Sequence, residues 1–149
     1  MKKILFAVAA LALIGSCKKK DPSPTEYLTN GKWKLTSATF LGVDISSDLK
    51  DCQKDNLYTF NSNKSITAYE GATKCYDTVA DSKTDGNWAL TSADKQLTLS
   101  GSSIAESFGI TGNLTVDVVT LNETTLSVKK DTAFSGFSGT VNMTFSDTQ

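Results

Sequence analysis

The sequence predicts an all-β fold, an antiparallel up-and-down β-barrel of about eight strands. Ser, Thr, Asn, Asp and Gly are abundant and Pro is scarce, a composition typical of short strands joined by polar turns. Several short segments alternate apolar and polar residues, as Leu97 and Leu99 do with their neighbours. Beyond the N-terminal segment, no long stretch has the period of an amphipathic helix. Closing such a meander into a barrel removes its exposed edges.

The alternating segments also place the individual strands. The predicted strands are 32–40, 57–61, 65–70, 87–91, 96–100, 115–121, 125–129 and 140–145. Polar loops are predicted at 42–56, 71–85 and 131–139, and the Gly/Ser-rich residues 101–113 are ambiguous. In the first strand, Trp33, Leu35 and Ser37 are expected on one face. The predicted core consists of Trp33, Phe60, Trp88, Leu97, Leu99, Leu126 and Phe145.

The N-terminus predicts an export signal that ends at a lipid-modified cysteine. Lys2 and Lys3 precede an unbroken apolar run over residues 4–14. This run is too short to span a bilayer, which needs about 20 apolar residues, but it suits a signal peptide. The following Ile-Gly-Ser-Cys resembles the bacterial lipobox, with Cys17 as the lipid acceptor. The alternative is an ordinary secretory signal that happens to contain a cysteine.

We therefore expect a cleaved lipoprotein signal peptide at 1–16, a lipidated Cys17 with a flexible tether at 17–26, and one folded domain at 27–149. The tether is charged, contains Pro and lacks apolar periodicity. Two or more acyl chains give stable membrane anchoring. The residue after Cys17 is not Asp, so we expect the bacterial outer membrane, with the domain facing the periplasm or the cell surface.

Several short motifs carry a family resemblance. Gly31-Lys32-Trp33 opens the first predicted strand, Gly86-Asn87-Trp88 begins a strand in mid-chain, and a Leu-Thr-Leu strand follows. With the turn at 121–126, these motifs resemble the lipocalin-like domain of small bacterial lipoproteins over roughly residues 28–146. The resemblance implies an eight-stranded barrel that binds a small hydrophobic or glycan-like ligand. It also implies a late-strand Arg over the first Trp, a place that only Lys129 or Lys130 could take here.

Two cysteines remain once Cys17 is lipidated. An even pair in an exported chain suggests a disulfide between Cys52 and Cys75, which joins the two long polar loops. In the chain-entropy description, such a bridge stabilises the fold by about 3 kcal/mol. The alternative, a redox or metal-binding pair, is disfavoured because the chain has no Cys-x-x-Cys spacing and no His.

Composition argues against several classes of function. The net charge of -1 becomes -3 when the two leader lysines are removed, and the chain has no Arg, so we expect no nucleic-acid partner. Without His, the commonest general base and metal ligand are missing, so no enzyme, cofactor or metal is expected. A carboxylate pair such as Glu70 and Glu106 is the remaining route to catalysis. Asp44, Asp48, Asp51 and Asp55 form either a solvated acidic loop or a cation site.

The ligand candidates are aromatic residues expected near the barrel mouth: Tyr58, Tyr69, Tyr76, Phe134 and Phe137. Aromatic side chains there could stack on a sugar or line an apolar pocket. Alternatively, Phe134 and Phe137 plug the end of the barrel. A second hypothesis for the whole protein is an envelope interaction or inhibitor module without a small ligand. A protruding loop at 101–113 or 131–139 would favour it.

Overall fold

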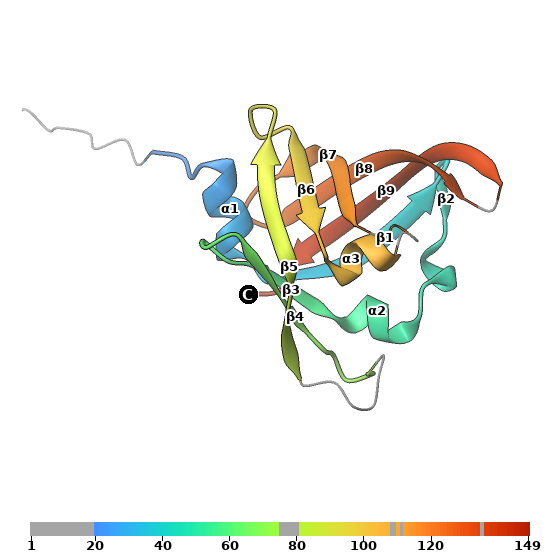
Figure 1. Ribbon diagram of the computed structural model, residues 1–149, viewed down its shortest axis with the longest axis horizontal. Coiled ribbons are helices and arrows are strands. Elements are labelled where there is room, and N and C mark those ends of the chain that lie inside the picture. The colour runs from blue at the N-terminus through green and yellow to red at the C-terminus, as the bar shows by residue number, and fades with distance from the viewer. Residues whose placement is uncertain (1–19, 75–80, 108–109, 111, 135) are drawn as a thin grey trace, which may run out of the picture.

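The computed structural model is a single closed β-barrel (Figure 1). It describes residues 20–74, 81–107, 110, 112–134 and 136–149. The strands are β1 Trp33–Phe40, β2 Val43–Asp44, β3 Leu57–Phe60, β4 Ser65–Tyr69, β5 Ser82–Thr91, β6 Gln96–Ser100, β7 Asn113–Leu121, β8 Thr125–Phe134 and β9 Phe137–Asp147. Their order is β2-β1-β3-β4-β5-β6-β7-β8-β9, and pairing of β1 with β9 closes an eight-stranded antiparallel barrel. The predicted fold class is confirmed.

Short helices lie at both ends of the barrel. They are α1 Pro24–Asn30, the 3-10 turn η1 Ser46–Asp48, α2 Asp51–Asp55 and α3 Ser103–Ser107. Helix α1 begins at a capping box, in which Ser23 and Glu26 satisfy each other's backbone N–H groups. It closes one end of the barrel, next to the short hairpin turns. Helices α2 and α3 lie at the other end, which we call the mouth (Figure 1).

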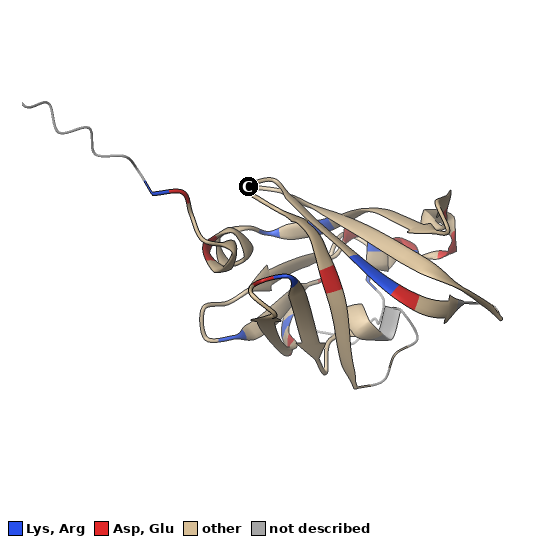
Figure 2. Ribbon diagram, turned by 90° about the horizontal axis from the view of Figure 1, so that it is seen from above, with Lys and Arg blue, Asp and Glu red and all other residues tan. Residues whose placement is uncertain are grey.

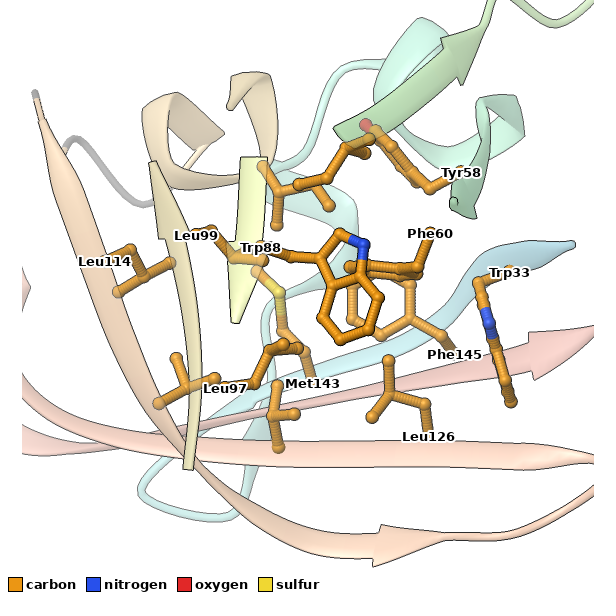
Figure 3. Packing of buried hydrophobic residues seen from close by; sticks show 14 of the residues in the cluster. Trp33, Tyr58, Phe60, Trp88, Leu97, Leu99, Leu114, Leu126, Met143 and Phe145 are labelled. Carbon is orange, nitrogen blue, oxygen red and sulfur yellow. The ribbon is translucent and has the colours of Figure 1, made fainter. Parts of the chain in front are cut away.

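Alternation along each strand fills the barrel interior with side chains. All seven predicted core residues are buried, and Ile66, Leu114 and Met143 join them. The rings of Phe60 and Trp88 meet edge to face with centroids 6.0 Å apart, and Figure 3 shows the aliphatic side chains packed around them. At the closed end, the Trp33 indole donates to the carbonyl oxygen of Leu28 at 2.9 Å.

The first strand differs from its predicted pattern because it contains a β-bulge. The register with β9 shifts between Leu35 and Ser37. One extra residue moves the inward positions by one, so Ala38 is buried after the bulge and Ser37 is not. Only Trp33 and Lys34 pair with β3, and the rest of β1 lies against β9, β2 and α2.

All three predicted loops contain regular structure, and the segment 42–56 holds β2, η1 and α2. Residues 131–139 were predicted as a loop, but they extend β8 and β9 into a long hairpin in which Phe134 pairs with Phe137. Strand β5 begins at Ser82, inside the predicted loop 71–85. The ambiguous segment 101–113 contains α3 and the start of β7. Strand β8 is extended by its hydrogen bonds with β9. The composition of residues 131–139 alone does not indicate this pairing.

Residues 1–19, including Cys17, lie outside the described part, so the signal peptide and its lipid site remain predictions. Among the described residues, no helix has the length and hydropathy needed to cross a membrane.

Candidate ligand site at the barrel mouth

The mouth contains a small apolar cavity beneath two helical segments. Its lining residues are Leu35, Leu49, Gln53, Tyr58, Ile104, Met143 and Phe145. Its volume is about 10 Å³, close to the minimum that can hold one water. None of the lining side chains is charged. This cavity is therefore too small for a ligand as long as the side chains that cover it stay in place.

The first cover is the segment from η1 to α2. The Ile45 amide donates to the Ala38 carbonyl oxygen at 2.9 Å, and the Ala38 amide donates to Ser46 Oγ at 3.2 Å, so this segment is fixed to β1. The Lys50 amide donates to Gln53 Oε1 at 2.9 Å at the start of α2. Leu49 and Gln53 are thereby placed over the cavity.

The second cover is α3, which is fixed to β5 through Asp85. The Asp85 carboxylate is buried, and its Oδ2 accepts from Ser102 Oγ at 2.7 Å and from the Ser103 amide at 2.9 Å. Ser102 Oγ in turn accepts from the Ile104 amide at 3.2 Å. These bonds hold Ile104 and Ala105 in the mouth, where both are buried.

Of the three predicted aromatic candidates whose side chains are described, Tyr58, Tyr69 and Phe137, only Tyr58 lines this cavity. Tyr58 was expected to be exposed, but it is buried because it shares the inward face of β3 with Phe60. Tyr69 is half-buried, and it lies on the other face of β4 from Ala68. Tyr76 and the side chain of Phe134 lie outside the described residues. Phe137 is 69% exposed, so it does not plug the barrel.

Most cavity residues could not be recognised from the sequence, because they come from polar loops or from strand positions that resemble ordinary core. Leu49 and Ile104 lie in the mainly polar segments 42–56 and 101–113, which also contain Ile45, Phe108 and Ile110. Apolar residues in a mainly polar loop are the signal that could have identified both covers. Gln53 had no comparable signal.

Burial perturbs the Tyr58 phenol. Desolvation raises the pKa of Tyr58 above its usual value, and hydrogen bonds with Ser103 and Asn56 partly oppose this. The folded state therefore favours the neutral phenol. Its stabilising contribution is complete below the ordinary pKa of about 10 and is lost as the pH rises toward the higher folded pKa.

We expect Tyr58 to ionise later than an ordinary tyrosine in an alkaline titration followed by tyrosinate absorbance. Because burial disfavours the phenolate, the Tyr58→Phe variant should lack the most alkaline step and keep the others. Identical late steps in the variant and the native chain would contradict the assignment.

Comparison with known proteins supports the fold. The profile of the lipocalin-like domain family matches residues 29–128, which is more than half of the chain. The chain belongs to this lipocalin-like family. No curated protein matches the chain. In this lipocalin-like barrel, the expected Gly-x-Trp residue is Trp33, which lies fully buried at the closed end.

The family resemblance implied a late-strand Arg over the first Trp, Trp33, and Lys129 or Lys130 in its place here. Neither lysine takes that place. Lys130 Nζ donates to the Thr115 carbonyl oxygen at 3.1 Å, and Lys129 is exposed on the outer face of β8. Instead, Lys64, in the turn between β3 and β4, places its Nζ 3.8 Å from the centroid of the Trp88 ring on β5. A Lys therefore covers the second Trp of this lipocalin-like barrel, and the hydrogen bond to Leu28 holds the first.

The remaining sequence candidates that the structure describes do not line the cavity. Cys52 is buried in α2, and Cys75 lies outside the described residues, so their disulfide remains a prediction. Asp44 accepts from the Ser46 amide, Asp51 pairs with Lys54 at 2.7 Å, and Asp55 accepts from the Thr73 amide. Within the described ranges, no cluster of three acidic or Cys side chains could hold a metal ion.

A second surface projects beyond the mouth. Residues 131–134 and 137–140, with the adjoining turn 41–42 and β2, form what we call the overhang (Figure 2). Phe137, Leu41 and Val43 on it are 69%, 61% and 67% exposed. Leu41 has a φ of 49°, uncommon for a bulky side chain. A Cβ at Gly139 would lie 2.6 Å from the Leu41 side chain, so this glycine makes room for it.

Proposed function

We propose that the protein is a membrane-anchored lipoprotein whose barrel binds a small, neutral and mainly hydrophobic ligand at the mouth, beneath α2 and α3. The observation that carries the proposal is the composition of the cavity. Five of its lining side chains are apolar, and Gln53 and Tyr58 supply neutral polar groups. Family membership supports binding of a ligand in general.

This lining favours a hydrophobic ligand over a glycan. A sugar needs several hydrogen-bonding groups, because its hydroxyls lose their water on binding. A largely apolar molecule requires few such groups and gains from burial at about 25 cal/mol per Å² of apolar surface. Since the cavity is nearly full, the ligand must displace Ile104, Leu49 or both. Short segments with few contacts open more readily than barrel strands.

The proposed lipid anchor at the N-terminus and the mouth lie at opposite ends of the barrel. The described chain begins at residue 20, beside α1, at the end of the barrel opposite α2 and α3 (Figure 1). Lipid on Cys17 would therefore hold the closed end toward the membrane. The mouth would face away from the lipid, toward the compartment that supplies the ligand. We propose the outer membrane as the site of anchoring.

The proposal predicts that Ile104→Ala tightens binding of N-phenyl-1-naphthylamine, a neutral fluorescent probe, about tenfold or more. The reason is that a ligand no longer needs to expose a buried isoleucine, which costs about 1.5–3 kcal/mol. Fluorescence titration measures the affinity. Ile66→Ala is the matched control, because Ile66 is fully buried on β4 away from the mouth. An equal effect of both variants, or no probe binding by either, would overturn the proposal.

The overhang supports a second candidate function, docking of an envelope protein. Exposed aromatic residues are enriched at protein interfaces, and the sequence has no charged residue between Asp131 and the hairpin tip. Phe137→Ser should weaken such a complex about tenfold or more, as expected for an aromatic hot spot. Cross-linking in envelope membranes checks this, with Val119→Ser as the control on the exposed outer surface of β7. Equal cross-linking of both variants would count against docking at the overhang.

A further inference from the structure

Helix α1 fixes the chain to the closed end of the barrel a short distance after Cys17. The helix begins at Pro24, directly after its N-cap Ser23. Leu28 of this helix is fully buried, and its carbonyl oxygen accepts the Trp33 indole N–H at 2.9 Å. The helix is therefore part of the packed barrel end, and only the residues before Ser23 can form a tether to a lipid on Cys17.

The described part of this tether lies against the closed end. Lys20 lines a hollow of about 440 Å³ together with Tyr27 of α1, Glu123 and Gln149. Glu123 belongs to the turn between β7 and β8, and Gln149 follows β9. We call the surface formed by α1, the turn 122–124 and residues 147–149 the anchor face.

The length of the tether sets how far the anchor face can lie from a lipid on Cys17. Lys20 follows Cys17 by three positions. A fully extended chain spans at most about 3.6 Å per residue, so the two residues lie within about 11 Å of each other. The polar headgroup layer of a bilayer is about 5–8 Å thick on each side. With its lipid in the bilayer, Cys17 would therefore keep the anchor face close to the headgroups.

We propose that the anchor face rests on the membrane surface and that phospholipid headgroups are its partner. This inference rests on the proposed function, because it requires the lipid on Cys17. Lys18, Lys19 and Lys20 place three ammonium groups between that lipid and the barrel, and lysines near a membrane surface are attracted by anionic phospholipids. The large exposed hydrophobic side chains of the described residues lie outside the anchor face, so this face contacts headgroups without entering the acyl layer.

Contact at the anchor face sets the height of the mouth above the membrane. Strand β9 runs from Asp147, which lines the hollow at the anchor face, to Phe137 at the tip of the overhang. Its 11 residues span at most about 35 Å. The mouth and the overhang are therefore held away from the headgroups, and a ligand reaches the mouth from the water rather than directly from the bilayer (Figure 1).

Paramagnetic NMR in nanodiscs tests this contact. The lipidated full chain, isotope-labelled, is placed in nanodiscs of phosphatidylethanolamine and phosphatidylglycerol that contain a headgroup nitroxide lipid, TEMPO-phosphatidylcholine. The nitroxide broadens the signals of nearby amides. We expect the amide signals of Asn30 and Glu123, at the anchor face, to lose most of their intensity. The signals of Ile104, at the mouth, and Thr132, on the overhang, should keep theirs.

The matched variant carries about ten additional Gly and Ser residues between Lys20 and Asp21, a flexible linker that spans about 16–19 Å on average. In this variant, the signals of Asn30 and Glu123 should recover toward the intensity of Ile104. Equally weak broadening at both ends of the native barrel would overturn the contact and leave the lipid anchor in place. Stronger broadening at Ile104 than at Glu123 would overturn it as well. A native protein of unmodified mass that does not co-purify with nanodiscs would refute the anchor itself.

Discussion

Replacing Trp33 with alanine should lower the free energy of unfolding by about 3–5 kcal/mol, the range for truncating a large buried aromatic. Trp33 has no exposed surface, and its indole N–H satisfies the Leu28 carbonyl oxygen at the end of the barrel. A Cβ at Gly31 would lie 2.7 Å from the indole, which shows how tightly the chain wraps it. The substitution therefore leaves a cavity and an unpaired carbonyl beneath α1.

Urea unfolding measures this loss. Lys34→Ala is the control, because Lys34 is the next residue of β1 and is not buried. Surface substitutions usually change stability by less than about 0.5 kcal/mol. A loss of under about 1 kcal/mol for Trp33→Ala would show that this tryptophan does not organise the closed end.

Gly86→Ala should cost about 2–3 kcal/mol or more, because backbone strain and a collision act together. Gly86 has a φ of 99°, and its added Cβ would collide with the Ser100 carbonyl oxygen and lie 2.7 Å from Gly101. The ends of β5 and β6 would have to separate next to the start of α3. We therefore also expect faster hydrogen exchange in α3.

Gly42→Ala separates the two causes. Gly42 also has a positive φ, 81°, but nothing lies within 4 Å of an added Cβ. Only the left-handed backbone penalty of about 1–2 kcal/mol applies there. Thermal unfolding of both variants gives the comparison. Equal losses would mean that the close approach of β5 to residues 100–101 contributes nothing.

The sequence predicted the barrel because the information for it is local. Alternation at 96–100 places Leu97 and Leu99 inward, and the same rule applied to Phe60 also buries Tyr58, which we had expected to be exposed. The family motifs are also local, and they identified the closed end of the barrel, which contains Trp33. Hairpin turns at 62–64, 92–95 and 122–124 are encoded by their own residues and were placed correctly.

The mouth could not be predicted in this way because its structure depends on long-range contacts. Helix α3 has only five residues, too few to show a helical periodicity in the sequence, and it is fixed by Asp85 on strand β5. The bulge in β1 changes its inward face without any Gly or Pro to mark it. The long β8–β9 hairpin follows from pairing between strands, whereas its Gly and Ser residues alone favour a loop.

Native mass spectrometry of the mature protein, purified from its own host without refolding, tests the ligand site most directly. The account predicts a stoichiometric additional mass belonging to a small neutral hydrophobic molecule. It also predicts that this mass is absent from an Ile104→Trp variant, in which the larger side chain blocks the mouth. A bare native protein that also fails to bind N-phenyl-1-naphthylamine would contradict the ligand site and favour docking through the overhang.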